Sequence, residues 1–144
     1  MILNRQNRIR IQQAPLVRFE ARLRRELVLQ GRELTVCFVD DREMARLNKK
    51  FRGKAKPTDV LSFPTNGHAD RGFSPRRRED FLGDIAISPE TARRNAQRYG
   101  RALDDELRVL ILHGVLHLLG HDHETDNGQM ERKEIRLRRK FGLT

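Results

Sequence analysis

The sequence has a single cysteine, no tryptophan and one tyrosine among its 144 residues. One thiol cannot form an intramolecular disulfide or a zinc site built from several cysteines, and we expect no disulfide-linked partner. Cys37 lies in the apolar run of residues 34–39, so we expect a buried, unreactive thiol. The shortage of cysteine therefore excludes the small disulfide-rich proteins and the cysteine-based zinc modules.

Long hydrophobic segments are also missing. The longest apolar stretch, residues 109–119, contains two histidines and is too short to span a bilayer. Residues 1–10 are polar and basic and lack the hydrophobic region of a secretory signal. We therefore expect a cytoplasmic protein that has no membrane partner.

Aromatic residues make up only 6% of the chain, which argues against an RNA-recognition module that stacks bases. Charge, in contrast, is abundant: 30 basic residues against 20 acidic ones give a formal net charge of +10. Lysine occurs at only six positions, so most of the basic residues are arginine, whose rigid fork of donors suits phosphate. A genome that prefers arginine codons would explain the same bias. The charge favours a polyanionic partner, bound mainly through its phosphates and more weakly as salt rises.

Hydrophobic periodicity predicts one α+β domain over residues 1–144, with a small mixed sheet of about four strands packed against several helices. Strands are expected at residues 9–11, 34–39, 60–63 and 82–87, and helices at 16–29, 41–51, 89–99, 103–119 and 129–141. Residues 65–80 have no periodicity and contain the basic run 76–78, which predicts a surface loop inserted in the domain.

Four of the five histidines fall within residues 113–123. His113 and His117 are four residues apart, which places both imidazoles on one face of the most apolar helix, where they need polar partners. Gly120 favours a turn that brings His123 back toward the same point. We therefore predict one Zn²⁺ held by His113, His117 and His123, with the fourth tetrahedral position open as in a catalytic zinc site.

The spacing of these histidines is also that of the metzincin proteases, which carry a glutamate general base directly after the first histidine. Gly114 occupies that position here, and residues 115, 116, 118 and 119 are apolar, so no nearby carboxylate replaces the base. The sequence therefore has the histidine spacing of a zincin-like metal site but lacks the general base of a peptidase, so a metallopeptidase is disfavoured. His121 is expected at the surface or beside the ligands rather than as a fourth ligand.

The segment from His113 to His123 resembles the signature of the YbeY family of bacterial endoribonucleases, the ribosomal RNA maturation factors. Residues 47–53, 57–64 and 82–88 match further stretches of that family in the same order, and residues 141–143 match its close. The resemblance covers most of the chain from about Leu34 onward. The loop at residues 65–80 is an addition to it.

The resemblance implies a zinc-dependent, single-strand-specific endoribonuclease that acts in 16S ribosomal RNA 3′-end maturation and ribosome quality control. Its partner is then single-stranded ribosomal RNA of the small subunit, with no small-molecule cofactor. The metal-binding histidines of the family fall on His113, His117 and His123, and its functional arginine falls on Arg52. A guanidinium at this position would stabilise charge that develops on the phosphoryl oxygens.

Two alternatives stay open. Arg52 could also be an ordinary cation at a helix C-terminus, a position where basic residues are favoured by the helix dipole. For the whole protein, a ribosome assembly factor with a structural metal and no catalysis fits the basic charge equally well.

Overall fold

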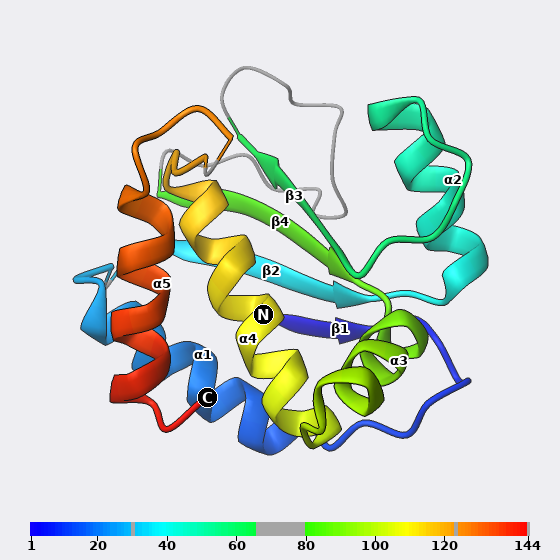
Figure 1. The fold of residues 1–144 in the computed structure, drawn as a ribbon, viewed down its shortest axis with the longest axis horizontal. Coiled ribbons are helices and arrows are strands. Elements are labelled where there is room, and N and C mark those ends of the chain that lie inside the picture. Colours follow the sequence, from blue (N-terminus) through cyan, green and yellow to red (C-terminus); the bar gives the residue numbers. More distant parts are fainter. Residues whose placement is uncertain (30, 66–79, 123, 144) are drawn as a thin grey trace.

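The computed structural model describes residues 1–29, 31–65, 80–122 and 124–143. In these residues the chain forms β1 (Ile2–Asn4), α1 (Gln13–Glu26), β2 (Glu33–Phe38), α2 (Asp41–Arg52), β3 (Val60–Pro64), β4 (Phe81–Ile87), α3 (Pro89–Tyr99), α4 (Leu103–Leu118) and α5 (Gln129–Lys140). Most of the predicted loop at 65–80 falls outside the described residues. Figure 1 shows α4 lying across the sheet between α5 and α3.

The strands form one mixed sheet in the order β1-β2-β4-β3. β1 and β2 pair in parallel, as do β2 and β4, whereas β3 runs antiparallel to β4 along one edge. Every residue of β4 is buried. The mixed sheet of four strands packed against helices is therefore confirmed, and its edge strand β3 lies against α4.

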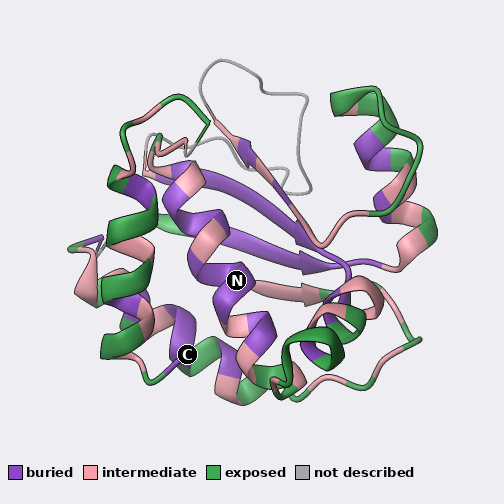
Figure 2. Cartoon of the chain, in the orientation of Figure 1, coloured by how far each residue is buried: buried purple, intermediate pink, exposed green. Residues whose placement is uncertain are grey.

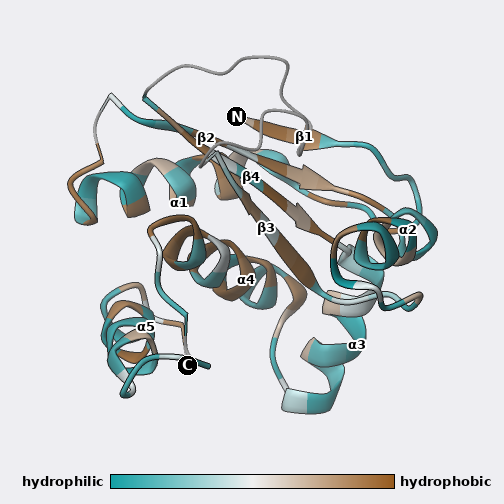
Figure 3. Cartoon of the chain, turned by 90° about the horizontal axis from the view of Figure 1, so that it is seen from above, coloured by the Kyte–Doolittle hydropathy of each residue, from teal (hydrophilic) through white to brown (hydrophobic). Residues whose placement is uncertain are grey.

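The two faces of the sheet are covered by different helices, because successive side chains of a strand point in opposite directions. Val36 and Ile85 belong to the large core that includes residues of α1, α4 and α5. Cys37 and Ala86, their neighbours in sequence, pack on the other face with Met44 of α2. Figure 2 shows the buried residues concentrated on the strands and α4, and Figure 3 shows the same strands as hydrophobic.

Cys37 is fully buried, as expected. Burial is the main reason that the pKa of its thiol is raised to about 11. A thiol with this pKa is almost entirely protonated at neutral pH, and the thiolate is the reactive form.

The first strand is not where the sequence predicted it. Residues 9–11 form no strand, and β1 instead comprises Ile2–Asn4, paired with Val36–Phe38 of β2. The side chain of Gln6 explains the difference: its amide donates to the Ile9 carbonyl and accepts from the Ile9 backbone N–H, each at 2.9 Å. The backbone groups of Ile9 are therefore satisfied locally, without a strand partner.

Side-chain caps begin both α2 and α3. The Asp40 carboxylate accepts from the Glu43 backbone N–H at 2.8 Å, and the Ser88 hydroxyl accepts from the Thr91 backbone N–H at 3.3 Å. Gly53, with a φ of 73°, ends α2 in the left-handed conformation that favours glycine. The bounds of both helices agree with the prediction to within one residue.

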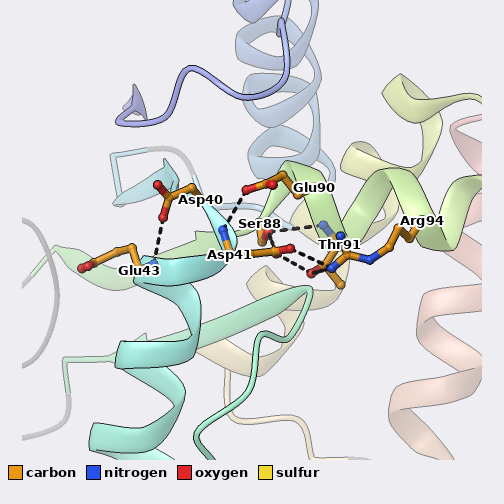
Figure 4. Close-up of polar contacts among 7 residues, drawn as sticks. All are labelled: Asp40, Asp41, Glu43, Ser88, Glu90, Thr91 and Arg94. Carbon is orange, nitrogen blue, oxygen red and sulfur yellow. Dashed lines mark hydrogen bonds and ion pairs between the residues drawn. The ribbon is translucent and has the colours of Figure 1, made fainter.

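A cluster of hydrogen bonds around Asp41 joins the N-termini of α2 and α3 (Figure 4). Oδ1 of Asp41 accepts from the hydroxyls of Ser88 and Thr91 at 2.5 and 2.7 Å, and Oδ2 accepts from the Arg94 guanidinium at 2.8 Å. The Asp41 backbone N–H donates to Glu90 at 2.9 Å. Burial acts to raise the pKa of Asp41, but these hydrogen bonds outweigh it and hold the pKa below its ordinary value. The cluster anchors the start of α2, whose other end reaches the site described next.

Candidate functional site

His113 and His117 lie one turn apart on α4 and face each other. Their Nε2 atoms are 3.0 Å apart, and their ring centroids are 4.6 Å apart with the rings nearly perpendicular. Both residues are half-buried, with 28% of the His113 side chain exposed, although the sequence predicted imidazoles enclosed by apolar side chains. The difference arises because the buried side of α4 is formed by other residues, and the histidine side faces a pocket.

This pocket, here called the histidine pocket, has a volume of about 490 Å³. His113 and His117 line it from α4, Arg52 lines it from the end of α2, and Asp59 lines it from the start of β3. The fold therefore brings Arg52 to the same pocket as the two histidines, although it lies 61 positions before His113 in the sequence. Arg52 and the two imidazoles can attract an anionic group to one part of this pocket, whose lining also includes the carboxylates of Asp59, Asp122 and Glu124.

Packing around α2 and β3 places Arg52 at this pocket. The preceding residue, Phe51, packs its ring edge-on against Phe63 of β3, with the centroids 5.0 Å apart. The buried Asn48 donates its side-chain amide to the Lys56 carbonyl at 2.9 Å, which ties α2 to the segment that follows it. The arginine is exposed, so its guanidinium can reach a ligand while its backbone is held.

The end of α4 turns the chain back as the sequence predicted. Gly120 has a φ of 92°, its N–H donates to the His117 carbonyl, and the His121 N–H donates to the Leu116 carbonyl. This pair of bonds is the Schellman motif that closes helices through a left-handed glycine. As a result His121 and Asp122 also line the histidine pocket. His123, the third predicted ligand, lies outside the described residues.

A carboxylate that the sequence analysis did not single out supports the first histidine. Oε1 of Glu134, on α5, lies 2.6 Å from Nδ1 of His113, and Oε2 pairs with Arg138 at 3.1 Å. Burial acts to raise the pKa of Glu134, but the hydrogen bond to His113 and the nearby cations outweigh it and lower the pKa. An ionised carboxylate can only accept, so Nδ1 of His113 carries the hydrogen of this contact, and in the neutral imidazole Nε2 then has the lone pair.

The sequence pattern of α5 could have indicated that Glu134 faces the protein interior. Met130 and Leu137 are the buried residues of this helix, and Glu134 lies between them at helical spacing on the same side. A carboxylate at an inward position of an amphipathic helix needs a hydrogen-bond or charge partner. His113 is that partner.

Gly114, which replaces the peptidase glutamate, has a packing reason. A Cβ at this position would come within 2.8 Å of Cγ2 and 3.0 Å of Cδ1 of Ile85 on β4. On the other side, the Ser62 hydroxyl of β3 donates to the Gly114 carbonyl at 3.2 Å. The glycine lets α4 approach the sheet closely, so position 114 has no room for a glutamate general base.

The histidine pair fits a zinc ion. Two Zn–N bonds of about 2.0–2.1 Å at a tetrahedral angle place their nitrogens roughly 3.3 Å apart, close to the separation of 3.0 Å between the Nε2 atoms. A ligand histidine whose other nitrogen donates to a carboxylate is the usual arrangement at such sites, and His113 has it. Within the described ranges, which leave out His123, no three His, Cys, Asp or Glu side chains gather as a metal site.

Comparisons with known proteins give one consistent result. The family model described as Endoribonuclease YbeY matches residues 1–142, so the match includes the N-terminal strand and helix. An Endoribonuclease YbeY of Koribacter versatilis is 42% identical over 145 residues, covering 99% of this chain and 86% of the relative. One of Solibacter usitatus is 45% identical over 126 residues, covering 88% and 77%. The solution structure of a Thermotoga maritima protein aligns with a TM-score of 0.63 at 28% identity, covering 99% of this chain and 90% of that one.

The fold and the pocket define an α+β protein whose central helix presents a histidine pair beside an arginine. The family model that matches residues 1–142 and the relatives with 42% and 45% identity all carry the same description, endoribonuclease YbeY. The chain belongs to the endoribonuclease YbeY family.

Proposed function

We propose that this protein is a zinc-dependent endoribonuclease that cleaves single-stranded RNA in the histidine pocket. The observation that carries the proposal is the pair of Nε2 atoms 3.0 Å apart, on a pocket that Arg52 also lines. The names of the relatives support RNA as the substrate, and a net charge of +10 suits a polyanion. In the part of the chain that the structure describes, no helix is long and apolar enough to cross a bilayer.

His113 and His117, together with His123, are the residues that would hold the zinc ion. Zinc bound there would act as a Lewis acid on a phosphoryl oxygen. Glu134 accepts from Nδ1 of His113 and so keeps Nε2 directed away from it, toward His117. The role of Glu134 is to orient this ligand and to select its tautomer.

Arg52 would bind the phosphate that is cleaved. The scissile phosphate gains charge on its oxygens in the transition state, and a guanidinium donates to two of them at once. Because Arg52 reaches the pocket from α2 and the histidines reach it from α4, the phosphate would be held from two sides. The interaction strengthens as charge develops, so it lowers the barrier rather than only tightening substrate binding.

The biological role proposed for this activity is 16S ribosomal RNA 3′-end maturation and ribosome quality control on the small subunit, in the cytoplasm. The resemblance of residues 113–123 and 57–64 to the family supports it. The basic charge also suits binding to ribosomal RNA.

The deciding experiment compares zinc-loaded wild type with His117→Ala on single-stranded ribosomal RNA fragments, on the same sequences as duplexes, and on casein. We expect wild type alone to cleave the single strands, and neither protein to cleave casein. RNA cleavage that persists in metal-free His117→Ala would reveal a contaminating nuclease. Absence of cleavage by zinc-loaded wild type would favour an assembly factor with a structural metal.

A further inference from the structure

A second pocket adjoins the histidine pocket at His113. This side pocket has a volume of about 370 Å³ and is walled by Tyr99 and Asn95 of α3, by Val109 and other residues of α4, and by Arg138 of α5. Asp59, Val60 and His113 line both pockets. If an RNA strand crosses the histidine pocket, the side pocket therefore has room for one of its neighbouring nucleotides.

The charges of the side pocket do not suit a phosphate. Its two arginines are already engaged: Arg101 forms an ion pair with the buried Glu106, and Arg138 forms one with Glu134 at 3.1 Å. The carboxylate of Asp59, which accepts from Asn95 at 3.2 Å, also lines the pocket. Because each cation has a carboxylate partner, an added anion would meet carboxylates as well as guanidinium groups.

The surfaces of the side pocket suit a flat, uncharged ring. Tyr99 is the single tyrosine of the chain, and it is 63% exposed although most large hydrophobic side chains are buried. The Arg101 guanidinium lies 5.7 Å from the centroid of its ring and steadies it by a cation–π contact. Val109 and Leu110 line the pocket with mostly buried side chains, and Asn95 lines it with its amide. An exposed aromatic ring for stacking and a nearby amide for hydrogen bonding are elements with which proteins hold a nucleobase.

We propose that the side pocket binds a nucleobase of the RNA, one that stacks on Tyr99 next to the phosphate held in the histidine pocket. The inference rests on the proposed function, since it takes the ligand to be an RNA strand. It also refines the expectation from composition: the chain has too few aromatic residues for a stacking surface, but one tyrosine at the rim of the site is enough for one base.

The test is a scan of short single-stranded RNAs, each lacking one base at a different position. Binding is measured by fluorescence anisotropy in EDTA, with gels to verify that the strands stay intact. The proteins are wild type, Tyr99→Ala, Tyr99→Phe and, as a matched control, Ile135→Ala, which removes an exposed apolar side chain from α5. We expect wild type to lose affinity on the order of tenfold when one particular base is missing.

Tyr99→Ala is expected to bind the complete RNA about tenfold more weakly than wild type does. Its affinity should not fall further when the sensitive base is missing. Tyr99→Phe keeps the ring and should behave as wild type, and so should Ile135→Ala. The proposal is overturned if Tyr99→Ala binds the complete RNA as tightly as wild type does. It is also overturned if Tyr99→Ala binds every RNA more weakly than wild type by the same factor, including the RNA that lacks the sensitive base. Failure of the endoribonuclease proposal shows separately, as intact RNA in the zinc-loaded cleavage assay, because the scan measures binding alone.

Discussion

Oε1 of Glu134 and Nδ1 of His113 lie 2.6 Å apart, so the last helix of the chain sets the tautomer of a histidine on the central helix. The contact joins residues that are 21 positions apart in sequence. It makes α5 part of the site, although Glu134 does not line the histidine pocket.

Substitutions of Glu134 should weaken zinc binding. We expect Glu134→Ala to reduce zinc affinity roughly 10- to 100-fold, because the ligand histidine loses the partner that fixes its ring and tautomer. Glu134→Gln should lose less, since its amide oxygen can still accept from Nδ1 of His113. Competition with a chromophoric chelator measures the affinity, and nitrogen NMR of the imidazoles reports the tautomer. Glu131→Gln, an exposed change on the same helix, is the control, and equal affinity in all variants would contradict the assigned role.

Arg52→Ala should lower RNA cleavage without loss of zinc. Removal of a donor that stabilises transition-state charge costs roughly 10²–10³ in rate, and Arg52→Lys should recover part of it because lysine keeps the charge but not the fork. Single-turnover cleavage with zinc content measured on the same samples checks this. Lys49→Ala removes an exposed cation from the same helix and should leave the rate nearly unchanged. Zinc lost in parallel with activity would instead give Arg52 a structural role.

Gly114→Ala should destabilise the fold by roughly 1–3 kcal/mol, even though alanine favours a helix by about 1 kcal/mol over glycine. The new Cβ would lie 2.8 Å from Cγ2 of Ile85, an atom held close to the backbone of β4. Urea unfolding measures the loss in free energy of unfolding. Ile85→Ala in the same chain removes the clash, so the double variant should lose less than the two single losses combined. Strict additivity would mean that the close approach of α4 to β4 does not limit residue 114.

The Asp41 cluster should make part of the stability depend on pH. The folded pKa of Asp41 is depressed, so its contribution is present above the unfolded pKa of about 3.9 and is lost as pH falls through the folded value. Asp41→Asn should therefore be less stable than wild type at pH 7, and the difference should shrink below about pH 4. Urea unfolding of both proteins at several pH values gives this difference. If the difference in free energy of unfolding between the two proteins stays constant as the pH falls below about 4, the depressed pKa is contradicted.

Local sequence was sufficient for most helices and strands, because their signals involve residues close together. Asp40 and Ser88 cap the helices that follow them, Gly53 ends α2 in the left-handed conformation, and Gly120 turns the chain after α4 as the sequence predicted. The first strand was predicted wrongly, since alternation at residues 9–11 cannot reveal that Gln6 satisfies the backbone of Ile9.

For the site, the sequence by itself determined that His113 and His117 share a helix face, because that relationship depends only on helical periodicity. Tertiary structure alone brought Arg52 to their pocket and placed Glu134 behind His113. It also placed Tyr99 on a second pocket, which shares His113 with the first. These relationships depend on how α3 and α5 pack against α4 and on how the end of α2 packs against β3. Packing is decided by the complementary shapes of side chains far apart in the chain, such as Gly114 against Ile85, and a local pattern does not contain it.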